Sequence, residues 1–295
     1  MLGDRRAIPE RPGLAAAPDF VAIGHLTLDR IAGTLRPGGA ALYAAVTSDR
    51  LGLSAGIITS HGDDFPLDAI PPRIEVVSVP SGSTTTFTHV AEPGGRRLLA
   101  SREVATPLQP QDVPEDWRSA PLVLLAPVLG EVDGTLARAF DDASVAAAAQ
   151  GWLRSRQPDG TVAPAPWEDA PLVLPGLQAL FVSDEDTRGL GDEVQEWFQH
   201  VPIGAFTAGR HGALLFVNGE RYDVRPLRVS EMDETGAGDV FAAAFLAHYH
   251  RDGEPWEAAA AAACAAALSV ERPGLEGIPD AARLASALAG YHKDL

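Results

Sequence analysis

Short, continuous runs of apolar residues alternate with alanine-rich stretches along most of the chain. The runs include FVAIG, AGIITS, PLVLLAPV and ALFVS, and the longest helical stretches begin at Val240 and Trp256. A continuous apolar run of this length is typical of a strand that is buried on both faces. Strands of this kind separated by helices predict an α/β fold, with one mostly parallel sheet and helices on both of its faces.

One stretch, residues 81–102, departs from this alternation. It reads SGSTTTFTHVAEPGGRRLLASR, with a Pro-Gly-Gly turn signal between two polar segments. Two β-branched segments around a turn predict a β-hairpin. Because this hairpin has little apolar surface, we expect it to project from the main body as a lid. The segment after His25 could supply a partner strand, which places the lid segments near 26–37 and 82–102.

The rest of the chain predicts a simple organisation. Residues 1–18 predict a loose N-terminal extension, and residues 19–295 predict a single domain, which is within the size range of one large α/β unit. Residues 157–175 are rich in proline and acidic residues, and we expect them to form an excursion on the surface.

Charge and residue usage exclude several functions. The formal net charge is −17, from 40 Asp and Glu against 23 Lys and Arg, and no basic run is present. Nucleic acid and anionic membrane surfaces are therefore unfavourable partners. Lys293 is the only lysine, so a Walker-type phosphate loop and Schiff-base chemistry are excluded. Cys264 is the only cysteine, which excludes a disulfide framework and a multi-cysteine zinc site.

The sequence also bears on location. The apolar run around Cys264 spans only 13 residues between Glu257 and Glu271, too short to cross a membrane as a helix. The first residues contain prolines and charges where a signal peptide needs an apolar core. We therefore expect a soluble, cytoplasmic protein, with Cys264 as a small buried hydrophobe.

The strongest local signal is MDETGAGDVFAAAFLAHYH, which begins at Met232. Gly236, Ala237 and Gly238 precede Asp239 and open a predicted helix. Free backbone N–H groups at a helix start, together with the positive end of the helix dipole, bind anions. In a chain with one lysine, this is the natural place for a transferring phosphate. Asp239, at the mouth of the site, could take a proton from an attacking hydroxyl.

Two other interpretations of this segment remain open on the residues alone. Asp239 could simply cap the helix, while the glycines make a tight turn. The glycines also match the start of a GxGxxG dinucleotide fingerprint. Phe241 occupies the position of its third glycine, and the segment lies far from the N-terminus. The fingerprint needs a βαβ context, so this second alternative is the weaker one.

DETGAGDVFAAAFL resembles the C-terminal signature of the ribokinase-like sugar kinases, the PfkB family. RPGGAALYAAVTSDRLG and the AGIITSHGDDF that follows are similar to the N-terminal motif of this family, and VAIGHLTLDRI resembles its first strand with a substrate-side aspartate. FTAGRHGALLF resembles its T-x-G-x-x-G segment near the nucleotide. The similarity runs in the family's order from about Phe20 to Pro279.

This resemblance implies a ribokinase-like α/β fold over residues 19–295, with a mostly parallel central sheet flanked by helices on both faces and a small β lid. It also implies an ATP-dependent phosphotransferase that phosphorylates a hydroxyl of a small neutral sugar, polyol or nucleoside. Closure of the lid would exclude water, which otherwise competes as an acceptor of the phosphoryl group.

The resemblance further implies roles for individual residues. Asp239 would be the general base, and the anion hole would comprise Gly236, Ala237 and Gly238. Contacts to the acceptor are expected from Asp29, Gly38, Gly39, Tyr43 and Glu131. Contacts to ATP are expected from Ser183, Thr207, Gly209, Gly212, Ala267 and Gly274. Asp186 would bind Mg²⁺ through water, and Asp233 would lie at a site for a monovalent cation such as K⁺.

Three positions depart from the family pattern. Tyr43 stands where an Asn commonly follows the Gly-Gly pair, so sugar specificity cannot be inferred from ribokinase. Glu234 stands where the family usually has Thr or Pro, which adds an acid beside the phosphates. The N-x-x-E segment that organises magnesium becomes Ser183 to Asp186, and this replacement keeps one carboxylate.

Tyr43 and two further segments, APVLGEVD and the GWLR segment at Gly151, are similar to a subgroup of the family that includes inositol kinases. Within APVLGEVD, Glu131 ends a predicted buried strand on the substrate side and could bond a polyol hydroxyl. An acid in the first turn of the next helix is an equal alternative for Glu131.

The identity of the acceptor stays open on the sequence. A nucleoside kinase is the alternative within enzymes, and a catalytically weak ligand-binding sensor on the same fold is the alternative from another class. We expect ATP and Mg²⁺ as cofactors, K⁺ as a further candidate, and small molecules rather than nucleic acid or membrane as partners. Because lid strands leave exposed edges, we also expect a homodimer that pairs through the lid.

Overall fold

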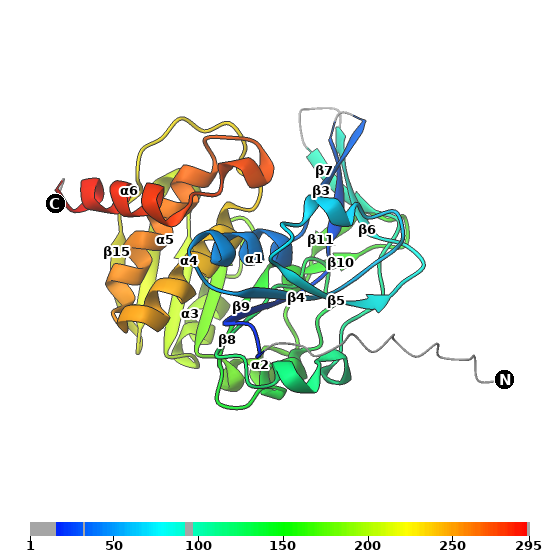
Figure 1. Cartoon of the computed structure of the whole chain (residues 1–295), viewed down its shortest axis with the longest axis horizontal. Helices are drawn as coiled ribbons and strands as arrows, with labels where there is room; N and C mark the ends of the chain where they lie inside the picture. Colours follow the sequence, from blue (N-terminus) through cyan, green and yellow to red (C-terminus); the bar gives the residue numbers. More distant parts are fainter. Residues whose placement is uncertain (1–15, 32, 92–96, 294–295) are drawn as a thin grey trace.

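A nine-stranded sheet forms the centre of the computed structural model, which describes residues 16–31, 33–91 and 97–293 (Figure 1). Its order is β15-β14-β13-β12-β9-β8-β1-β4-β5, parallel except for β14 and β15, which pair antiparallel at one edge. The strands are β1 (Phe20–Ile23), β4 (Ala55–His61), β5 (Glu75–Pro80), β8 (Leu122–Leu125), β9 (Ser144–Ala148), β12 (Ala179–Ser183), β13 (Ile203–Thr207), β14 (Ala213–Val217) and β15 (Glu220–Val224). The mostly parallel sheet was predicted from the continuous apolar runs.

Helices cover both faces of this sheet, and β1 shows why. Phe20 and Ala22 pack into a core cluster with helices α1, α4 and α5, whereas Val21 and Ile23 pack into a second cluster with Phe198 of α3. Successive side chains of a strand point to opposite faces, so a strand that is apolar at every position needs cover on both. The helices are α1 (Ala40–Arg50), α2 (Ala170–Val173), α3 (Gly191–Gln199), α4 (Ala237–Asp252), α5 (Pro255–Ser269) and α6 (Ala281–Lys293).

Alanine-rich α4 and α5 lie against one another on the face that also carries α1 (Figure 1). Their small side chains are almost all buried, and Cys264 is fully buried among them, as the sequence predicts. Burial raises the pKa of the Cys264 thiol to about 11, so this residue packs rather than reacts. Within the described residues, no helix has the length and apolar character needed to cross a membrane.

A second, four-stranded sheet of order β3-β2-β6-β7 projects from the main body (Figure 1). It comprises β2 (Thr27–Ile31), β3 (Thr34–Gly38), β6 (Thr85–Ala91) and β7 (Arg97–Ser101). Its strands fall in the two segments predicted for the lid, and β2 follows directly on the carboxyl end of β1. The tip of the predicted hairpin, residues 92–96, and most of the predicted N-terminal extension lie outside the described residues.

His25 joins the base of the lid sheet to the main sheet. Its ring is fully buried, with Nδ1 2.8 Å from the hydroxyl of Thr85 on β6 and Nε2 2.9 Å from the carbonyl of Thr106. The same Thr85 hydroxyl accepts a hydrogen bond from the amide of Ala105. Both ring nitrogens of this histidine are therefore engaged in fixing where the lid sheet begins.

Residues 157–175 do not form the surface excursion expected from their composition. After the hairpin of β10 (Arg154–Arg156) and β11 (Val162–Pro164), Trp167, Ala170 and Val173 are buried in the second core cluster. Trp167 stacks on Trp152, with ring centroids 4.9 Å apart. The expectation was wrong because it rested on the average composition of the segment, which its prolines and acids dominate. A few apolar side chains within the segment decide where it is buried.

Candidate active site

The amino end of α4 presents free backbone amides at the carboxyl edge of the main sheet. The helix begins at Ala237, after Gly236 in a left-handed conformation (φ 77°), and no side chain caps it. Within the described residues, the amides of Gly238 and Asp239 make no hydrogen bond, and a Cβ added at Gly238 would meet nothing within 4 Å. Uncapped amides facing open space fit an anion.

Asp239 is the third residue of α4 and not its cap, so the capping interpretation does not hold. Its side chain is half-buried. Burial, followed by the negative charge of Asp186, raises the pKa of Asp239 to about 7, and the positive charge of Arg154 acts in the opposite direction. A carboxylate with this pKa is matched to accepting a proton near neutrality. Residues 225–236 before α4 contain no strand, so the dinucleotide fingerprint also lacks its context.

The turn before α1 brings a second set of predicted residues to the same edge. Gly39 has a φ of 108° and lies so close to the carbonyl of His25 that a Cβ would overlap it, so only glycine suits this position. A Cβ on Gly38 would overlap the carboxylate of Asp29, which comes from lid strand β2. Burial, and then the charge of Asp233, raises the pKa of Asp29 to about 6.

Tyr43 connects this turn with the amino end of α4. Its side chain is buried in α1, and its ring lies against Gly236, where a Cβ would overlap the ring. Burial, and then the charges of Asp233, Asp29 and Asp239, raises the pKa of the Tyr43 hydroxyl. The phenol is therefore neutral and can donate a hydrogen bond. The fold thus brings four of the five predicted acceptor residues, all but Glu131, to the same edge of the sheet as the predicted base.

Asp233 ties the loop before α4 to the loop after α5. One carboxylate oxygen accepts from the amide of Thr235 and the other from the amide of Gly274, each at 3.1 Å. Arg36 of lid strand β3 lies 4.0 Å from the second oxygen. Burial raises the pKa of Asp233, but the hydrogen bonds from Thr235 and Gly274 outweigh it and lower the pKa overall. A bound monovalent cation would have to share these oxygens, and that site stays a prediction.

The residues predicted to contact the donor lie on neighbouring loops at this edge. Ser183 and Thr207 are register partners at the carboxyl ends of β12 and β13. The turn after β13 contains two glycines in the left-handed region, one of which lies against the carbonyl of Val224. The remaining predicted donor contacts are in this turn and at the end of α5 with the loop that follows: Gly209, Gly212, Ala267 and Gly274.

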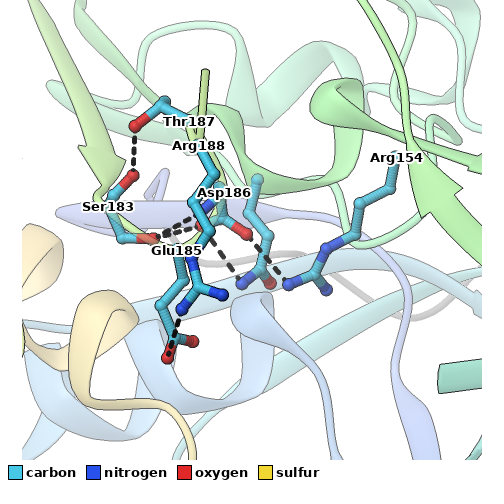
Figure 2. Close-up of polar contacts among 7 residues, drawn as sticks. Arg154, Ser183, Glu185, Asp186, Thr187 and Arg188 are labelled. Atoms are coloured by element: carbon cyan, nitrogen blue, oxygen red, sulfur yellow. Dashed lines mark hydrogen bonds and ion pairs between the residues drawn. The ribbon is translucent and has the colours of Figure 1, made fainter. Parts of the chain in front are cut away.

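Three side chains hold Asp186 (Figure 2). One carboxylate oxygen accepts from Nη2 of Arg154 at 3.0 Å, and the other accepts from the hydroxyl of Ser183 at 2.6 Å and from the amide of Gln150 at 3.5 Å. The side chain of Asp186 is 7% exposed. Ser183 and Asp186 were predicted from the sequence, whereas Arg154 and Gln150 were not. Arg154 lies in the GWLR segment that begins at Gly151, but nothing in the sequence indicated that this segment contacts Asp186.

Asp186 fits a limited role in binding magnesium. Within the described residues, no three His, Cys, Asp or Glu side chains converge on a possible metal site. Mg²⁺ is commonly held by one or two carboxylates and completes its shell with water and substrate phosphates. Asp186 is a single carboxylate that acts electrostatically on Asp239, so it fits a Mg²⁺ ion that binds together with a polyphosphate. The donor set therefore fits Mg²⁺ bound with the phosphates, and not a metal held by the protein alone.

Glu131 does not present the free carboxylate expected of a contact to an acceptor hydroxyl. It is 3% exposed, and its oxygens accept hydrogen bonds of 2.7 to 3.1 Å from the amides of His25, Val128 and Leu129. No helix begins at Glu131, since the next helical turn starts at Gly134, so the alternative is wrong too. The carboxylate instead fixes the loop after β8 to the end of β1.

Comparison with known proteins shows the family to which the chain belongs. The sequence model of the pfkB family carbohydrate kinase matches residues 31–281, and the chain belongs to this family. The cytidine kinase of Thermococcus kodakarensis is 25% identical over 259 residues, which cover 81% of this chain and 91% of that protein. The 2-dehydro-3-deoxygluconokinase of Thermoproteus tenax is 27% identical over 258 residues, covering 81% and 76%.

Among solved structures, one described as a pyrophosphate-dependent myo-inositol-1 kinase converted into a myo-inositol-3 kinase by mutation aligns with a TM-score of 0.75. It shares 22% identity and covers 92% of this chain and 98% of its own. Ribokinase structures align as well, and the fold is ribokinase-like, as the sequence predicts. The protein is a kinase of sugar-like or nucleoside substrates, and this is the class that its fold and family define.

Proposed function

We propose that the enzyme transfers a phosphoryl group from MgATP to a hydroxyl of a small neutral polyol, sugar or nucleoside, with Asp239 as the general base. One observation carries the proposal. A half-buried carboxylate with its pKa raised to about 7 lies in the first turn of α4, beside free amides that can bind a phosphate. A base and an anion hole on consecutive residues suit transfer to a hydroxyl.

The chemistry follows from this arrangement. The acceptor oxygen attacks the terminal phosphorus of the donor, and its proton passes to the carboxylate of Asp239. The bond from that phosphorus to the bridging oxygen breaks, and ADP leaves with the electron pair. The amides of Gly238 and Asp239 would stabilise the charge on the transferring group. Mg²⁺, held beside Asp186 and Ser183, would neutralise part of the charge on the phosphate oxygens.

The acceptor side of the site supports a neutral acceptor. The charges of Asp29, Asp233 and Asp239 act on the hydroxyl of Tyr43, and the opposing charge comes from Arg36, a half-exposed residue of the lid. Carboxylates accept hydrogen bonds from hydroxyl groups, whereas an anionic acceptor would meet like charge. A polyol or an unphosphorylated sugar therefore fits this side better than a sugar acid or a sugar phosphate. A nucleoside remains the second candidate, because the cytidine kinase of Thermococcus kodakarensis is among the relatives.

Release of ADP from MgATP in the presence of inositols, hexoses, pentoses, nucleosides and sugar acids tests the proposal. We expect turnover with at least one neutral polyhydroxy acceptor and none with sugar acids. Pyrophosphate belongs in the donor panel because a structural neighbour is described as dependent on it. Efficient phosphorylation of a sugar acid would contradict the proposed acceptor class. Turnover with pyrophosphate but not MgATP would contradict the proposed donor.

The association of two copies through the lid is also a proposal. β3 is the outer strand of the lid sheet, and Leu35 on it is 43% exposed. The opposite edge, β7, is partly covered by a bridge between Ala100 and Thr161. An exposed strand edge with an apolar side chain can pair with a second copy. Light scattering should give a dimer mass, and Leu35→Lys should give a monomer, whereas a monomeric wild type would contradict this.

A further inference from the structure

The donor side of the site is short of positive charge. Asp186, Asp233 and Asp239 lie around the amino end of α4, and the exposed Glu234 adds a fourth acid. The only lysine, Lys293, is the third residue from the carboxyl end of the sequence. A polyphosphate that approaches α4 therefore meets like charge, which Mg²⁺ offsets only in part. Arg36 lies 4.0 Å from Asp233 on the lid side, so a further side-chain cation is needed on the side of Asp186.

Arg154 is placed to supply that cation. It is the first residue of β10, and its guanidinium points to Asp186, as Figure 2 shows. The ion pair is 3.0 Å long, and the two side chains are 25% and 7% exposed. A guanidinium has five N–H donors. Within the described residues only one N–H of Arg154 is engaged, by Asp186, so the others remain for a ligand.

Arg154 also lies within electrostatic reach of the catalytic base. The charges of Asp186 and Arg154 act on Asp239 in opposite directions, so all three side chains share one end of the site. The hydroxyl of Ser183 and the amide of Gln150 bind the carboxylate of Asp186 and restrict its position. An arginine held by a fixed carboxylate needs little reorganisation before it binds a ligand.

We propose that Arg154 contacts the phosphates of the phosphoryl donor and stabilises the group that is transferred, while Asp186 holds the guanidinium in position. The planar fork of a guanidinium matches two phosphate oxygens, which a compact ammonium cannot do. This inference rests on the proposed function, since it concerns the donor of that reaction. It assigns a further catalytic residue, on a segment outside both sequence motifs.

Donor binding to three single variants tests the inference. Arg154→Gln removes the charge and keeps a hydrogen-bond donor for Asp186, and Arg154→Lys restores the charge without the fork. Arg188→Gln is the matched control, because Arg188 is 77% exposed and pairs with Glu185 at 3.9 Å in the same loop (Figure 2). Calorimetry with magnesium pyrophosphate and with MgATP measures affinity without turnover.

We expect Arg154→Gln to weaken both donors by about tenfold or more, since a charge-assisted hydrogen bond to phosphate is lost. Arg154→Lys should recover part of the affinity, and Arg188→Gln should bind as the wild type does. In steady state, Arg154→Gln should lower kcat and raise the donor KM, with the acceptor KM nearly unchanged. Unchanged donor affinity in Arg154→Gln, or a rise confined to the acceptor KM, would overturn the inference.

The binding experiment separates this inference from the proposed function. If no acceptor is phosphorylated by the wild type, the proposed function fails, and the affinities for pyrophosphate still decide the role of Arg154. If Arg154→Gln does not fold, as judged by its melting temperature, the double variant Arg154→Gln with Asp186→Asn leaves no unpaired buried charge. Its affinity for pyrophosphate without magnesium is compared with that of the single variant Asp186→Asn, and equal affinity in these two folded variants would overturn the inference.

Discussion

The ring of Tyr43 lies directly on the backbone of Gly236, so the N-terminal Gly-Gly turn and the C-terminal GAGD segment form one surface. Any side chain at Gly236 would overlap the ring, and its φ of 77° already disfavours other residues. The contact fixes the distance between the proposed acceptor side of the site and the proposed anion hole. Both segments were identified by their resemblance to the family motifs, and the fold shows that they are in contact through Tyr43 and Gly236.

Tyr43→Phe should separate the packing role of this ring from its hydroxyl. The ring keeps its contact with Gly236, so we expect the melting temperature to change little. If the hydroxyl donates to the acceptor, the acceptor KM should rise by about three- to tenfold, the usual value of one neutral hydrogen bond. Gly236→Ala is the contrasting variant and should damage both donor and acceptor binding. An unchanged acceptor KM in Tyr43→Phe would make Tyr43 a packing residue alone.

Asp239→Asn should abolish most of the activity and leave donor binding intact. Loss of a general base typically lowers kcat by about 10²- to 10⁴-fold. Affinity for MgATP should hold or improve, because a negative charge beside the phosphates is removed. Single-turnover rates and calorimetry on the same preparation make the comparison. A fall in kcat of less than about tenfold, with normal donor binding, would require another base.

The pH dependence of activity should report the carboxylates of the site. Asp239, whose pKa is about 7, faces Asp186 and Arg154, and Asp29 titrates at about 6 nearby. The base works when ionised, so kcat/KM should rise with pH and level off above about 7. A profile flat between pH 5 and 8 would contradict the assignment of Asp239.

The free energy of unfolding should also depend on the ionisation of Asp239, but it should fall with pH where the activity rises. The folded state holds the proton of Asp239 up to a pH of about 7, whereas the unfolded chain releases it near the ordinary value of 3.8. Between these values the folded state binds more protons, so this group makes the free energy of unfolding fall as pH rises. Asp239→Asn should therefore show a flatter stability profile than the wild type across this range, measured by urea unfolding at several pH values.

Glu131→Gln should destabilise the fold without acting on the chemistry. The carboxylate accepts hydrogen bonds from the backbone amides of His25, Val128 and Leu129. A glutamine has only one acceptor oxygen, and its NH₂ group cannot accept from these amides. We expect a loss of about 1–3 kcal/mol in the free energy of unfolding. Glu196→Gln, on the exposed side of α3, is the control and should change stability little. A large rise in acceptor KM with unchanged stability would restore Glu131 as a substrate contact.

The features that could be predicted from the sequence are those that depend on residues close together along the chain. The proposed anion hole and the proposed base, Gly236 to Asp239, lie within one helical turn, and a helix start has free amides whatever it packs against. The mostly parallel sheet was predictable for a similar reason, because a strand that is apolar on both faces needs two covered faces. The two lid segments followed from a local turn signal and β-branched residues. Each of these rests on short-range rules.

The tertiary structure decided whatever depends on partners from distant segments. Glu131 and Asp186 are both acids near the ends of strands, and the sequence gives no reason for their different roles. The backbone amide of the distant His25, together with amides of its own loop, binds the carboxylate of Glu131, whereas Arg154 of β10 pairs with Asp186. The burial of Trp167 was not predictable from its polar neighbours in the sequence, because it depends on stacking against Trp152. The sequence determined the local geometry that can bind a phosphate, and only packing decided which acids face the site, because a carboxylate's role depends on the donors around it.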